Sequence, residues 1–191
     1  MSPSAYAAAF AIGLLVAIVG FIVVTDYNAV MSLRQRIDKA WANVDVVLKQ
    51  RHDQLPALVT AVRGLMAFEQ DVLVAVTQAR AAYSPTEPIP DKAVHSEATT
   101  TAVRSLLAVV EAYPDLTAHQ NVLDLQREIE RLESMIADRR ELYNDQVYRY
   151  NTRITQLPGA LLAPLFGWRA REFFAAEPVE RARPDTDLRS T

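Results

Sequence analysis

The chain has 191 residues, a formal net charge of −3 and no cysteine. This length allows one domain with a short accessory segment, the mild negative charge gives no clustered basic face for nucleic acid, and the lack of cysteine excludes disulfides and thiolate metal ligands. Only five glycines occur, ten prolines gather at a few places, and apolar residues rarely alternate with polar ones. The sequence therefore predicts an all-α protein.

Residues 5–24, AYAAAFAIGLLVAIVGFIVV, contain no charged side chain. A helix of this length extends about 30 Å, which matches the hydrocarbon core of a bilayer. A cleaved signal peptide is the alternative, but residues 1–4 carry no basic side chain and no convincing small-x-small cleavage site follows the run. We therefore predict a short extracytoplasmic stub at 1–4 and a retained transmembrane helix at 5–24.

The charges that follow this span predict its orientation. Arg34, Arg36 and Lys39 lie on its C-terminal side, and no basic side chain precedes it. By the positive-inside rule the N-terminus lies outside and the C-terminal part in the cytoplasm, as a single-pass protein of the cell (inner) membrane. Small residues at four-residue spacing within the span are compatible with a homo-oligomer through this helix, although alanine-rich spans show such spacing by chance: Ala9, Gly13 and Ala17.

Apolar residues at three- and four-residue spacing predict four further helical stretches. The first follows the span and falters at 51–56, and the second continues to about residue 79. A proline-rich loop at 83–90 precedes the third stretch, which covers about 91–112. The fourth covers about 117–156 and ends at Pro158.

The interruption at 51–56 has two interpretations. The heptad phase runs through it, which favours one kinked helix. A helix of about 55 residues would be about 80 Å long, however, far beyond the roughly 33 Å of the third stretch. We therefore predict a tight turn at 51–56, and with it an antiparallel up-and-down four-helix bundle over 25–157.

The dipeptide Tyr-Asn occurs three times in the chain. Tyr143 and Tyr150 are seven residues apart, nearly two helical turns, so both lie on the apolar stripe of the fourth stretch. A buried tyrosine usually finds a hydrogen-bond partner for its hydroxyl group. The favoured interpretation is a packing motif, and the alternative is a partner-binding surface at the membrane end of the bundle. The candidate residues are Tyr27, Asn28, Tyr143, Asn144, Tyr150 and Asn151.

Residues 158–174 form an apolar segment that is too short and too rich in proline to span a bilayer. Large apolar side chains are followed by two arginines, as in elements that lie at the membrane interface. The alternative, a wrap over the end of the bundle, stays equally open. The candidate interface residues are Leu161, Leu162, Leu165, Phe166, Trp168, Arg169 and Arg171. The polar residues 175–191 are expected to be disordered.

The sequence carries no recognisable catalytic, metal or cofactor motif. His52, His95 and His119 are isolated, and no phosphate-binding glycine loop or nucleophile motif occurs. Glutamates of the fourth stretch alternate with arginines, which is typical of a solvated, salt-bridged face. We expect no enzymatic activity and no cofactor.

Two blocks of the chain resemble the LemA family: residues 26–64, with AW..VDV.LK.R..Q.P.LV, and residues 112–168, with AYPDL.A, then YN..V..YN, then P..L.A.LFG. The resemblance implies a small bacterial protein with one membrane anchor, a short outer terminus and a cytoplasmic four-helix bundle. It implies no catalytic residues.

Two classes of function follow. The first is a membrane-anchored scaffold or adaptor that recruits an unknown protein partner at the cytoplasmic face of the bacterial cell membrane. The alternative is a lipid-contacting, membrane-organising module whose working surface is the segment 158–174. The partners expected are the lipid bilayer and a protein, with no nucleic acid.

Overall fold

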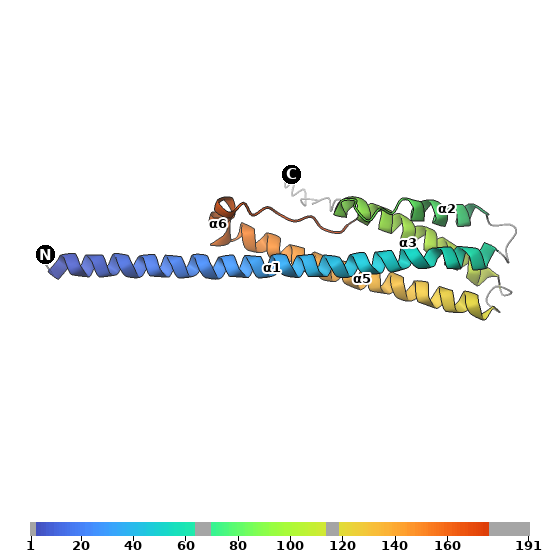
Figure 1. Cartoon of the computed structure of the whole chain (residues 1–191), viewed down its shortest axis with the longest axis horizontal. Helices are drawn as coiled ribbons and strands as arrows, with labels where there is room; N and C mark the ends of the chain where they lie inside the picture. The colour runs from blue at the N-terminus through green and yellow to red at the C-terminus, as the bar shows by residue number, and fades with distance from the viewer. Residues whose placement is uncertain (1–2, 64–69, 114–118, 176–191) are drawn as a thin grey trace, which may run out of the picture. The chain divides into compact units, whose positions relative to one another are not determined.

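The computed structural model describes residues 3–63, 70–113 and 119–175. These residues form five helices and no strand, as the all-α prediction requires (Figure 1). The helices are α1 (Pro3–Arg63), α2 (Gln70–Ala81), α3 (Ile89–Ala112), α5 (Gln120–Thr155) and α6 (Gly159–Phe166). Residues 3–4 of the predicted stub belong to α1, whereas the predicted start of the fourth stretch and the tail from 176 onward lie outside the described residues.

The chain divides into two compact units, described separately below. Unit 1 contains residues 1–46 and 137–172, and unit 2 contains residues 47–136 and 173–191. The long helices α1 and α5 contribute to both units, so the unit boundary falls inside each of them.

The turn predicted at 51–56 is wrong, because α1 continues through this stretch with Pro56 inside it. Proline has no N–H group and leaves the carbonyl four residues earlier without its helical partner. Here that carbonyl belongs to His52, and Arg80 of α2 donates to it from Nε at 3.2 Å. Arg80 therefore supplies the hydrogen bond that Pro56 withholds.

The length of α1 after residue 24 needs no turn, because this part of α1 matches α5 in length and not α3. Residues 25–63 of α1 extend about 58 Å, close to the roughly 54 Å of the 36-residue helix α5. The helix α3 has 24 residues and is shorter than both. The predicted second stretch is in fact the end of α1 and the separate helix α2.

Unit 2 contains the end of α1, all of α2 and α3, and the first half of α5. The contact between Arg80 and His52 places the end of α2 beside α1, so the two helices run in opposite directions. Aliphatic side chains from all four helices are buried there, including Leu58, Val62, Val76, Val103, Leu106, Ile129 and Leu132. This unit has an ordinary aliphatic helix-bundle core.

Unit 1 is built on the first part of α1 and the last part of α5, with α6 beside them (Figure 1). Its core combines aliphatic and aromatic side chains: Val30, Ile37, Val44, Tyr143, Val147, Tyr150 and Ile154. Those of α1 recur every seven residues and those of α5 every three or four, so each helix presents one apolar face.

The start of α1 differs from its later part. In the described part of the chain, α1 is the helix that is long and apolar enough to cross a membrane, by length and composition. The apolar window that meets this criterion is entirely unburied. Its large side chains, Phe10, Leu15 and Phe21 among them, have no protein covering them, as expected of a helix that faces lipid.

Candidate functional site

The candidate site is the end of unit 1 that follows the apolar stretch of α1. Asp26 lies two residues beyond Val24, and its side chain is 1% exposed. Arg153 of α5 forms an ion pair with it. A buried carboxylate needs such compensation because removing a charge from water is costly.

Gly159, the first residue of α6, fits closely between the other two helices. A Cβ atom on this residue would collide with the carbonyl oxygen of Arg153 and would lie 3.4 Å from Oδ2 of Asp26. Only glycine lets α6 begin against the last turns of α5. The first residue of α6 therefore lies next to the Asp26 carboxylate.

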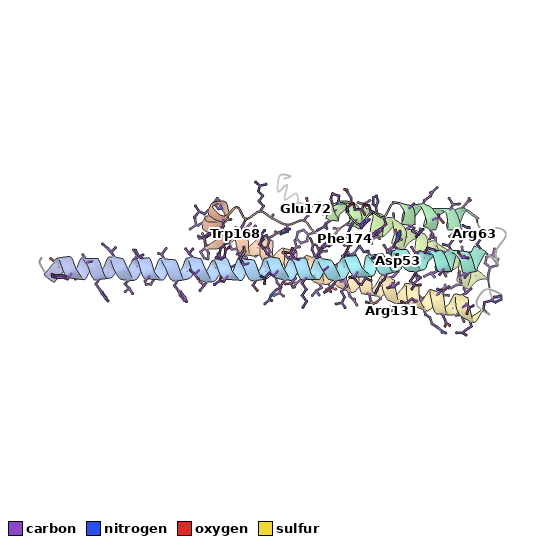
Figure 2. All side chains as sticks on the ribbon, viewed as in Figure 1. Asp53, Arg63, Arg131, Trp168, Glu172 and Phe174 are labelled. Atoms are coloured by element: carbon purple, nitrogen blue, oxygen red, sulfur yellow. The ribbon has the colours of Figure 1, made fainter. Side chains whose placement is uncertain are left out.

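Three aromatic rings join α1 to α6 and the residues that follow it. The ring of Tyr27 lies 5.1 Å from that of Phe166 and 6.2 Å from that of Trp168, and the latter two stack at 5.2 Å. Gly167 ends α6 with φ of 65°, a left-handed conformation that favours glycine. This turn places Trp168 back against the protein, where it is 7% exposed (Figure 2).

Residues 167–172, called here the C-terminal segment, follow α6 and are held by side chains of α5. The Asn151 amide exchanges two hydrogen bonds with the backbone of Arg171: Nδ2 donates to its carbonyl at 2.9 Å, and Oδ1 accepts from its N–H at 2.8 Å. The hydroxyl of Tyr143 donates to the carbonyl of Glu172 at 2.9 Å. These three bonds satisfy backbone groups of the segment that have no partner in a helix or a sheet.

Tyr143 is the most buried link in this arrangement. Its ring is 1% exposed and meets the ring of Trp41 edge-on at 5.5 Å. Burial raises the pKa of Tyr143 to about 12, because the charged phenolate is disfavoured away from water.

The six Tyr-Asn residues therefore have different surroundings. Tyr143 and Tyr150 are buried, and Tyr143 and Asn151 bind the C-terminal segment. Asn144 is half-buried, and Tyr27 and Asn28 are exposed. Tyr27 nevertheless packs on Phe166 and Trp168, so five of the six lie in or against the packed part of unit 1, and a partner surface at the Tyr-Asn pairs stays a prediction.

The candidate interface residues separate into two groups. Leu162 and Trp168 are buried within unit 1, and Arg171 lies 3.9 Å from the carboxylate of Asp38. The exposed group comprises Leu161, Leu165, Phe166 and Arg169. The helix α6 consequently has one side packed on the protein and one apolar side exposed.

Sequence reasoning missed a polar network inside unit 2. Arg51 is 4% exposed and donates from Nη1 to Glu133 at 2.9 Å and to Thr100 at 2.8 Å, and from Nη2 to Ser96. The sequence contains a sign of this network, because Arg51 lies seven residues after Val44 and seven before Leu58, on the apolar side of α1. A charged residue in an apolar phase indicates a buried partner.

A small cavity beside this network is lined by Arg51, Arg80, Lys92 and His52, among others, and holds about 10 Å³, enough for one water molecule. Burial and the neighbouring charge of Arg80 lower the pKa of His52. No group of three or more histidine, aspartate or glutamate side chains among the described residues is placed to hold a metal ion.

These features define an all-helical protein whose first helix carries a candidate membrane span and then packs with α5 and α6. A model of the LemA family matches residues 40–188, and the chain belongs to this family. The match includes α5, α6 and the C-terminal segment that form the candidate site.

Curated relatives match a shorter stretch. Magnetosome proteins MamQ 1 and MamQ 2 of Paramagnetospirillum magneticum are 35% identical over 78 residues. Magnetosome protein MamQ of Magnetospirillum gryphiswaldense is 31% identical over the same length. The matched stretch covers 41% of this chain and 29% of each relative.

Proposed function

We propose that this LemA-family protein is a non-enzymatic scaffold, tethered by residues 5–24 to the bacterial inner membrane with its folded part at the cytoplasmic face. The observation that carries the proposal is the continuity of α1. The helix runs from its exposed apolar stretch through Asp26 to the buried Val30 without a break. This continuity suits a scaffold, because an unbroken helix keeps the folded part at a fixed distance from the membrane.

We further propose that α1, α2, α3 and α5 alternate in direction as an up-and-down bundle. The support is the antiparallel contact of α2 with α1 at Arg80 and His52. The proposed bundle keeps four helices, as predicted from the sequence, but with α1 unbroken at 51–56.

Proximity labelling tests the scaffold role. A biotin-transferring enzyme fused to the C-terminus should label a defined set of cytoplasmic-face proteins in living cells. A matched control deletes residues 1–25, which removes the anchor and should lose that set. A second control carries the same span on an unrelated helical domain, and labelling of the same proteins by this control would contradict the proposal.

A lipid-contacting role is the second candidate, and one observation favours it. The outer side of α6 exposes leucines beside the start of the folded part of α1.

A further inference from the structure

We propose that the exposed side of α6 is a lipid-binding surface that lies in the headgroup layer of the bilayer and fixes unit 1 against it. The inference rests on the proposed anchoring of the chain by residues 5–24. Its occupant is a lipid surface, and the argument comes from the spacing, depth and charge of the residues around α6.

The surface is an apolar ridge formed by Leu161 and Leu165 of α6, which are 68% and 77% exposed. They are four residues apart, so they lie on one side of the helix. Leu157, which is 74% exposed, precedes α6 in the chain. A single exposed leucine is ordinary on a protein surface, whereas neighbouring exposed apolar side chains are typical of an interaction site.

The opposite side of α6 fixes the ridge in place. Leu162 is buried, Gly159 fits against Arg153, and Phe166 stacks on Trp168. These contacts leave the helix unable to turn the ridge inward without losing its own packing. The leucines therefore stay outward in the folded unit.

The depth of α6 follows from its contacts with α1. The ring of Phe166 packs on Tyr27, and Gly159 lies next to Asp26. These two residues of α1 come two and three positions after Val24, the end of the apolar stretch, which is about 3–5 Å along the helix. The headgroup layer on each side of the hydrocarbon core is about 5–8 Å thick. The ridge thus lies at the depth where amphipathic helices bind.

The charges at this end of unit 1 agree with a membrane surface. Asp26 is buried and paired with Arg153, whose side chain is 44% exposed. Arg169 is exposed, whereas Arg171 faces Asp38. Exposed arginines next to apolar side chains favour anionic headgroups. The exposed side chains of Phe21 and Val24 precede Tyr27 at three-residue spacing, so they lie near the side of α1 that meets Phe166.

Site-directed spin labelling of the full chain tests this inference. The chain has no cysteine, so single cysteines at Leu161 and at Leu165 each give one label. The labelled protein is reconstituted in vesicles of phosphatidylcholine and phosphatidylglycerol. Collisions with oxygen, which concentrates in lipid, are compared with collisions with a water-soluble nickel complex.

Two control positions set the scale. Val16→Cys lies within the span and reports whether the anchor is in lipid. Leu142→Cys is also an exposed leucine of unit 1, but it shares a groove with Arg36, which is twelve residues, or about 18 Å, beyond Val24. Its label should collide more with nickel than with oxygen. Retained helix content by circular dichroism verifies that each variant is folded.

We expect Leu161→Cys and Leu165→Cys to collide more with oxygen than with nickel, as Val16→Cys does. Nickel-dominated collisions at both α6 positions, with oxygen-dominated collisions at Val16→Cys, would overturn the lipid surface and leave the anchor intact. Low collision rates with both reagents at α6 would also overturn it, because they indicate a protein cover such as a second copy or the tail. Nickel-dominated collisions at Val16→Cys would instead refute the anchoring itself.

Discussion

At the scale of single residues, unit 1 uses buried polar side chains as specific links. Asn151 and Tyr143 bind the backbone of the C-terminal segment, and Arg153 neutralises Asp26. A buried polar group that loses its partner costs about 1–3 kcal/mol, which is more than the bond itself contributes. Each of these interactions therefore favours the observed packing of unit 1, because any other packing would leave a polar group without its partner.

Tyr143 should make the stability of unit 1 sensitive to alkaline pH. Its pKa in the folded protein is about 12, above the ordinary value of 10.0. Folding thus favours the neutral phenol, and the associated stability is complete below pH 10 and is lost as the pH rises to about 12. The loss amounts to at most about 3 kcal/mol.

The measurement is denaturant unfolding of the detergent-solubilised protein across this pH range. Tyr143→Phe should be less stable by about 1 kcal/mol at neutral pH and should lack most of the alkaline decline, because it has no phenol to ionise. Tyr148→Phe alters a side chain that is 62% exposed and should retain the decline. An equal decline in all three proteins would refute the assignment to Tyr143.

Asn151 should control the attachment of the C-terminal segment. In Asn151→Ala both bonds to the Arg171 backbone are absent, so the Arg171 amide hydrogen should exchange with solvent many-fold faster. Hydrogen exchange read by mass spectrometry on peptides covering 167–172 measures this. Asn28→Ala, at the exposed asparagine of the first pair, should leave exchange there unchanged.

At the scale of elements, proline inside a long helix is the informative feature. Pro56 normally predicts a break, and the interruption of the apolar pattern at 51–56 agrees with one. The helix nevertheless continues, with Leu55 and Leu58 fully buried on either side of the proline. The hydrogen bond from Arg80 and the burial of these leucines offset the loss of the helical hydrogen bond to the His52 carbonyl.

A double-mutant cycle should expose this compensation. Arg80→Met leaves the His52 carbonyl without a partner and should destabilise unit 2 by about 1–2 kcal/mol. In a Pro56→Ala background the new backbone N–H serves that carbonyl, so the same substitution should cost less. Chemical unfolding of the four proteins gives the coupling free energy, and a value of zero would show that Arg80 does not compensate for Pro56.

At the scale of the whole molecule, the proposed function depends on the orientation of the chain in the membrane. Basic residues follow the apolar span and none precedes it, so the C-terminal part is expected in the cytoplasm. A fluorescent protein that matures only in the cytoplasm should be bright when fused after residue 191. Alkaline phosphatase, which folds only outside the cytoplasm, should be inactive at the same position. Active phosphatase would reverse the topology.

Local pattern was sufficient for much of this protein. The period of the apolar residues predicted helices and their buried faces, since a helix must place one stripe against its neighbours. The uncharged residues 5–24 predicted a helix long and apolar enough to cross a membrane, and the seven-residue spacing of Tyr143 and Tyr150 predicted two buried tyrosines. These properties depend on residues within a few turns of one another.

Tertiary structure decided the remaining features, because they depend on partners far along the chain. The continuity of α1 at Pro56 required a donor from Arg80, 28 residues beyond the carbonyl that it serves. Which side of α6 packs on the protein required the positions of Tyr27 and Arg153, which cover one side of that helix and leave the leucines of the other side exposed. Sequence periodicity specifies which side of a helix is apolar, but the location of a compensating donor or a covering surface is fixed only when distant segments pack together.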